Sequence, residues 1–124
     1  MSDARAVSLA DVDPVELPNG SWSRLLITDA TVSGNAASLG YSVFTPGCVT
    51  DDLCHEVDEI AYVVAGRGAI RLSDRSIEVS ANDAIFVPGG TWHTVATVGT
   101  DDLIMVFSFP SSNYPPTQHR RPRT

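Results

Sequence analysis

Turn-forming residues divide most of this chain into segments that are too short for ordinary helices. Between Trp22 and Phe109, Pro, Gly, Asn or Asp recur about every 8–12 residues. The intervening segments alternate polar with apolar side chains, or are apolar and β-branched, and none shows a convincing helical period. This pattern predicts an all-β fold built as a sandwich or barrel of antiparallel strands.

The same pattern gives the domain organisation and the expected strands. We expect one domain, with an N-terminal lead-in at residues 1–19, a β-barrel at 20–110 and a loosely packed C-terminal tail at 111–124, where Pro and Ser are frequent. The segments at 69–72 and 76–80 should form a hairpin. The expected strands cover residues 22–28, 37–45, 60–65, 69–72, 76–80, 84–87, 91–98 and 103–109.

Composition excludes several classes of partner. The chain is 43% hydrophobic and 19% charged, which suits a folded domain, and its net charge is −7 with no lysine. An acidic protein without a basic stripe is not expected to bind nucleic acid or an anionic membrane. No apolar run is long enough to span a bilayer. The N-terminal residues do not resemble a signal peptide, so we expect a cytoplasmic protein in which Cys48 and Cys54 are reduced thiols.

One stretch, Gly47 to Gly66, carries the residues best suited to chemistry. His55 and Glu59 share strand parity, so one face of this segment can direct both side chains into the barrel. His93 follows a rigid Pro-Gly-Gly turn on a later segment. A buried, unpaired carboxylate is costly, and a cation between it and two neutral imidazoles removes that cost. These three residues are therefore the candidate ligands of a mononuclear metal site.

The spacing of these residues resembles the two motifs of a single-domain cupin. Gly47, His55, Glu59 and Gly66 match the first motif, but Leu53 occupies the place of its first histidine. In the second motif, Pro88, Gly90 and His93 match, whereas Asn82 and Thr97 replace the usual Gly and Asn. The resemblance covers residues 47–97 and implies a double-stranded β-helix, or jelly roll, of two antiparallel sheets.

The missing histidine leaves two interpretations of the site. In the first, His55, Glu59 and His93 form a facial triad for one divalent ion, with iron(II) favoured and manganese, nickel or zinc as alternatives. Alternatively, the metal has been lost and the same residues act as acid, base or binding groups. The triad favours a dioxygenase-type oxidation of a small organic metabolite. An isomerase, dehydratase or cyclase is the second hypothesis, and a ligand-binding protein without catalysis is the third.

Other residues are weaker candidates for binding a substrate. Arg24 could pair with an anionic group. Tyr41, Leu53, Tyr62 and Phe107 are candidates to line the cavity, although core packing also accounts for the aromatic residues. The family resemblance implies a homodimer. A single-domain cupin is also similar, at the level of fold, to tailoring enzymes of secondary metabolism.

Overall fold

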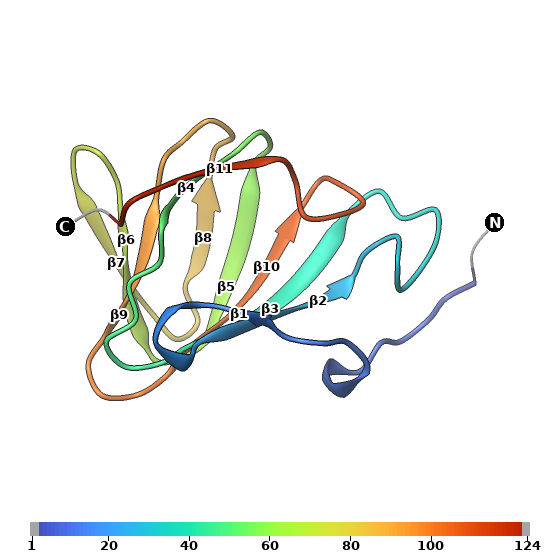
Figure 1. Cartoon of the computed structure of the whole chain (residues 1–124), viewed down its shortest axis with the longest axis horizontal. Helices are drawn as coiled ribbons and strands as arrows, with labels where there is room; N and C mark the ends of the chain where they lie inside the picture. The colour runs from blue at the N-terminus through green and yellow to red at the C-terminus, as the bar shows by residue number, and fades with distance from the viewer. Residues whose placement is uncertain (1–2, 123–124) are drawn as a thin grey trace.

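Two antiparallel sheets face each other and enclose the core in the computed structural model, which describes residues 3–122 (Figure 1). The larger sheet has the strand order β1-β2-β3-β10-β5-β8. Its strands are β1 (Val15–Glu16), β2 (Trp22–Ile27), β3 (Ser38–Phe44), β10 (Leu103–Phe109), β5 (Glu59–Ala65) and β8 (Ala84–Val87). Two short 3-10 helices, η1 (Leu9–Asp11) and η2 (Pro18–Gly20), flank β1.

The opposite sheet consists of two hydrogen-bonded parts. One has the order β7-β6-β9, with bounds Ser76–Ser80, Arg67–Arg71 and Thr94–Val98, and the other pairs β4 (Asp52–His55) with β11 (Thr117–Arg120). Two isolated antiparallel bridges, Val49–Ala96 and Leu53–His93, join the two parts. The predicted fold class is therefore confirmed, and the predicted hairpin is formed by β6 and β7.

Strand β10 shows how the core is built. Its residues alternate strictly between buried and half-buried, so that Leu103, Met105, Phe107 and Phe109 all point inward. This is the period of two that a strand imposes. Gly40 of β3 makes room for the Phe107 ring, because a Cβ atom at Gly40 would lie 2.1 Å from the ring. The aromatic rings therefore pack directly against the backbone of the neighbouring strand.

The prediction that His55 and Glu59 share one strand is wrong. His55 ends β4 and Glu59 begins β5, so they belong to opposite sheets and are joined by the connection 56–58. This connection is held against the loop that precedes His93. There the Gly89 N–H donates to Asp58 Oδ1 at 2.9 Å, and the Gly90 N–H donates to the His55 carbonyl at 2.8 Å.

The expectation of a loosely packed tail is also wrong for the described residues. Strand β11 pairs with β4, far from it in sequence, and Figure 1 shows the two side by side. Asp52 of β4 is only 1% exposed. Its carboxylate accepts a hydrogen bond from Arg120 Nε at 2.7 Å, and the Arg120 guanidinium stacks on Trp92. A buried carboxylate requires such a partner, which explains why this segment is ordered. Residues 123–124 of the predicted tail lie outside the described residues.

Candidate metal centre

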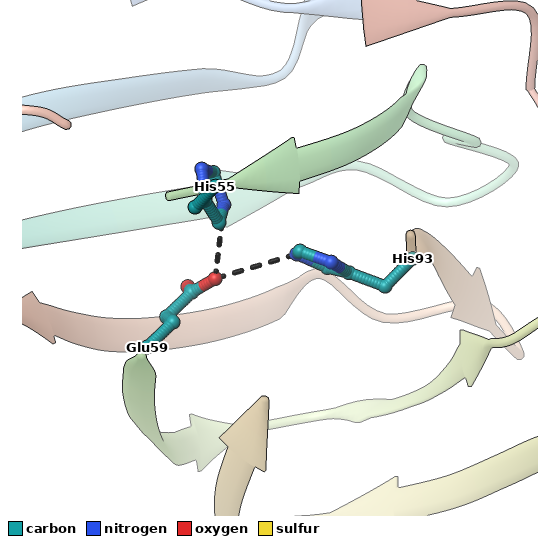
Figure 2. A group of neighbouring side chains, drawn as sticks. All are labelled: His55, Glu59 and His93. Atoms are coloured by element: carbon teal, nitrogen blue, oxygen red, sulfur yellow. Dashed lines mark ion pairs between the residues drawn. The ribbon is translucent and has the colours of Figure 1, made fainter. Parts of the chain in front are cut away.

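His55, Glu59 and His93 converge on one point inside the barrel, as Figure 2 shows. Their ligand atoms all lie within 4.8 Å of one another. Glu59 Oε1 is 3.2 Å from His55 Nε2 and 3.4 Å from His93 Nε2. The histidines are 4% and 3% exposed, so the group is largely removed from water. The sequence therefore identified three residues that the fold brings together.

Backbone hydrogen bonds fix the position of His93. Its N–H donates to the Leu53 carbonyl at 2.9 Å, and the Leu53 N–H donates to the His93 carbonyl at 2.8 Å. This pair ties the start of β9 to the middle of β4. Because β4 also carries His55, the two imidazoles are held on neighbouring segments, and their ring centroids are 5.1 Å apart.

The outer nitrogen of His55 is bound by a residue that the sequence did not single out. His55 Nδ1 lies 2.7 Å from Thr117 Oγ1 on β11. The Thr117 hydroxyl hydrogen is used for a bond to the Pro115 carbonyl at 2.9 Å, so its oxygen must accept the proton of His55 Nδ1. A neutral His55 then carries its lone pair on Nε2, which faces Glu59.

His93 is oriented in the same way. Its Nδ1 lies 2.9 Å from the Thr91 carbonyl, an acceptor that can only receive a hydrogen. Both neutral imidazoles therefore direct an Nε2 lone pair towards Glu59 Oε1. Hydrogen bonds from the second ring nitrogen are the usual way in which proteins orient histidine ligands for a metal. The arrangement fits a divalent cation held by two imidazole nitrogens and one carboxylate oxygen.

Without a cation, a proton must replace it. Burial raises the pKa of Glu59, but the hydrogen bonds and charges of His55 and His93 outweigh burial, so that the pKa lies below its ordinary value. Burial lowers the pKa of His93, but the hydrogen bonds to Glu59 and to Thr91 outweigh it and raise the pKa. The metal-free group is therefore held together by an imidazolium–carboxylate pair. A cation that binds there displaces the His93 proton.

Aromatic rings close one side of the group. The centroid of the His55 ring lies 4.8 Å from the centroid of Phe109 and 5.6 Å from that of Tyr114, and both pairs are T-shaped. Tyr114 was not predicted, because it lies in the Pro- and Ser-rich segment expected to be loose. Partial burial and the nearby Glu59 carboxylate raise the pKa of the Tyr114 phenol above its ordinary value. The C-terminal segment thus supplies both Thr117 and Tyr114 to the site.

A cavity of about 400 Å³ adjoins this group through Tyr114, and its lining includes none of His55, Glu59 and His93. Tyr114 belongs to both, because it lines the cavity and packs on His55. Two of the predicted substrate-binding residues, Leu53 and Phe107, line the same cavity. Its full lining is Val15, Leu17, Pro18, Ser23, Leu25, Ser42, Phe44, Thr50, Asp51, Leu53, Val95, Phe107, Tyr114 and His119.

The other predicted substrate-binding residues lie elsewhere. Arg24 donates from Nη1 to the carbonyls of Leu9 and Val12, at 3.2 and 2.8 Å, and so fastens the N-terminal segment. Tyr41 stacks on Trp22, beside Arg24. Tyr62 is 45% exposed and donates to Asn82 Oδ1 at 2.7 Å. On β2, Ser23 and Leu25 line the cavity, so the pleat turns Arg24 away from it.

The departures from the cupin motifs have structural explanations in two places. Asn82, where glycine is usual, has φ of +77°, a conformation that Asn tolerates better than most residues. The Thr97 hydroxyl donates to the Phe44 carbonyl at 3.3 Å.

Both cysteines are free thiols, and Cys48 is fully buried in the core. Within residues 3–122, no helix has the length and apolar character needed to cross a membrane.

A family model described as a cupin domain matches residues 40–109 of the chain. This range is more than half of the sequence and contains all three convergent residues. The chain therefore belongs to the cupin family. The prediction made from the two motifs is confirmed.

Two similar proteins come from polyketide biosynthesis. Tetracenomycin polyketide synthase protein TcmJ of Streptomyces glaucescens is 26% identical over 105 residues, which cover 84% of this chain and 70% of TcmJ. The solved structure of the polyketide cyclase RemF from Streptomyces resistomycificus is similar, with a TM-score of 0.78 and 26% identity. The match covers 94% of this chain and 85% of RemF.

Oxalate decarboxylase from Bacillus subtilis shares the fold. Its structure has a TM-score of 0.80 at 20% identity, and the match covers 90% of this chain and 30% of the decarboxylase. At that identity the likeness concerns the fold alone.

Proposed function

We propose that this protein is a metal-dependent cupin enzyme that cyclises a small organic molecule in the cavity beside His55, Glu59 and His93. The observation that carries the proposal is the convergence of two Nε2 lone pairs and one carboxylate oxygen next to a cavity. The similarity to TcmJ and to the polyketide cyclase RemF supports cyclisation over the other reactions of the fold.

His55, Glu59 and His93 would hold one divalent ion. When bound, the ion supplies Lewis acidity that polarises a substrate carbonyl. Glu59 Oε1 faces both imidazoles, which leaves Oε2 outside those two contacts. We assign Oε2 to taking a proton from the substrate carbon that forms the new C–C bond. The π bond of the carbonyl breaks as this bond forms, and the proton passes from Oε2 to the former carbonyl oxygen. The rings of Phe109 and Tyr114 limit access of water to this point.

Oxidation of a metabolite with dioxygen is the second candidate. Two histidines and one carboxylate, the donor set found here, favour non-haem iron(II). Neither TcmJ nor RemF is named as a dioxygenase. The identity of the ion and the need for dioxygen are therefore the two quantities that an experiment must separate.

The two candidates differ in their requirement for air. Protein purified without chelator would be analysed for bound metal and then incubated with linear poly-β-ketone thioester mimics, under argon and in air. Ring formation under argon, at equal rate in air, supports the cyclase. Substrate consumption that needs iron(II) and takes up dioxygen supports the oxygenase. Metal-loaded protein that transforms no substrate under either condition refutes both.

We also propose that two copies associate through the outer face of β5 and β8. Ile60, Tyr62, Val64 and Phe86 are 45–61% exposed on this face. The outward positions of these two strands carry no charge, so two chains of net charge −7 can approach there. Sedimentation should give a dimer, and Phe86→Glu should give a monomer with unchanged metal affinity.

A cytoplasmic, reducing location also fits the two free thiols.

A further inference from the structure

The cavity near the candidate metal centre is lined mainly by apolar side chains. Leu17, Leu25, Phe44, Val95 and Phe107 are among them. Burying apolar ligand surface against such walls is favourable in proportion to the area removed from water. The cavity therefore suits an apolar molecule, and its volume of about 400 Å³ exceeds that of a single small ring.

The ionisable side chains around the cavity already have partners. Asp51 and His119, at its rim, lie 3.5 Å apart and are each about half exposed, at 53% and 56%. Neither Lys nor Arg is among its lining residues within the described part of the chain. Arg24 is used by the carbonyls of Leu9 and Val12. A carboxylate placed in this cavity would lose its hydration and gain no cationic side chain in return.

A pair of serine hydroxyls lies among the apolar walls. Ser23 on β2 and Ser42 on β3 are directly paired, and their hydroxyl oxygens are 2.6 Å apart. One hydroxyl hydrogen is used between the two oxygens, and the second can be donated to a ligand. Ser42 is 2% exposed, so such a bond would form away from bulk water.

We propose that this cavity binds an uncharged, largely apolar aromatic molecule, and that the Ser23–Ser42 pair donates a hydrogen bond to a carbonyl or phenol oxygen of it. The inference rests on the proposed function, because it names the ligand class of the same site. It reverses the expectation that Arg24 pairs with an anionic group. Tyr114 links this ligand to the candidate metal centre, since its ring borders both.

Three matched probes test the charge of the ligand. Metal-free protein would be titrated calorimetrically at neutral pH with 2-naphthol, naphthalene and 2-naphthoate, which share a ring system. We expect 2-naphthol to bind at least about tenfold more tightly than 2-naphthoate, because the carboxylate loses hydration without a cation. Equal or tighter binding of 2-naphthoate, or no binding of 2-naphthol, overturns the proposal.

Variants test the place and the hydrogen bond. Ser42→Ala should weaken 2-naphthol about fivefold and leave naphthalene unchanged, because one neutral hydrogen bond is lost. Leu25→Trp should abolish binding of both by filling the cavity, whereas Phe86→Trp, on the outer face, should change neither. Val95→Phe is the alternative filling variant if Leu25→Trp fails to show a cooperative thermal transition. Unchanged 2-naphthol affinity in Ser42→Ala or in a folded filling variant overturns the assignment.

The outcome is independent of the metal. Protein that binds a divalent ion but not 2-naphthol refutes this inference and leaves the proposed metal centre intact. Protein that binds 2-naphthol as predicted but holds no ion refutes the proposed function and leaves the ligand class standing.

Discussion

Thr117→Val should weaken metal binding although residue 117 does not contact the metal. In the native protein His55 Nδ1 donates to Thr117 Oγ1 across 2.7 Å, in a ring that is 4% exposed. Valine has the shape of threonine but no acceptor. The Nδ1 proton would then be left without a partner, or would move to Nε2 and block the nitrogen that faces Glu59.

The size of the effect follows from those two outcomes. Loss of a hydrogen bond that orients a ligand typically costs about 10–100-fold in metal affinity. A buried N–H without a partner costs about 1–3 kcal/mol of unfolding free energy. Thr117→Val should therefore show both losses. Thr117→Ser, which keeps the hydroxyl and removes a methyl group, should retain most of the metal affinity.

Chelator-competition titrations under argon would measure the affinity of the three proteins, and urea unfolding of the metal-free forms would measure stability. If Thr117→Val binds the ion as tightly as the native protein, the role assigned to Thr117 is wrong. If Thr117→Ser loses as much affinity as Thr117→Val, packing of β11 accounts for the effect and the hydroxyl does not.

Three further predictions follow from the same contacts. For metal-free protein, the lowered pKa of Glu59 contributes stability that is present above its ordinary value of 4.5 and is lost as the pH falls through the lowered pKa. The raised pKa of His93 contributes stability that is present below 6.5 and is lost as the pH rises through the raised pKa. Urea unfolding should therefore show the largest difference between native protein and Glu59→Gln between these two values; a pH-independent difference would refute the pairing. Leu53→His, on the same face of β4 as His55, should tighten metal binding in the chelator titration, and unchanged affinity would mean that the new ring stays in the cavity. Arg24→Met should speed amide exchange and proteolysis of residues 9–12 without changing metal affinity, because Arg24 binds the carbonyls of Leu9 and Val12; a loss of metal affinity would contradict this assignment.

The parts of the fold that the sequence predicted are those with local signals. Alternation and turn residues placed β6, β7, β8 and β10 close to their observed bounds. Motif spacing identified His55, Glu59 and His93 because the chemistry of a metal site restricts residue types and their order. The alternation of side chains along one presumed strand predicted correctly that His55 and Glu59 converge, but the reason was wrong. The connection 56–58 passes from one sheet to the other.

The parts that were missed depend on long-range contacts. Strand β11 is ordered by pairing with β4 and by the bond between Arg120 and buried Asp52, more than sixty residues away. No local pattern in a segment rich in Pro and Ser indicates that Thr117 and Tyr114 reach His55. The sequence analysis considered an anionic partner for Arg24, but its partners are backbone carbonyls. No sequence pattern indicates which carbonyls a side chain will bind.

The proposed enzyme depends on one divalent ion shared by His55, Glu59 and His93. Metal-free native protein, His55→Ala, His93→Ala and Glu59→Gln would each be loaded with iron(II) under argon, separated from free ion by gel filtration and analysed for iron per chain. We predict close to one ion in the native protein and loss of the ion in all three variants, with each variant still folded by circular dichroism. Full occupancy in any folded variant, or no stable binding by the native protein, would contradict the central claim.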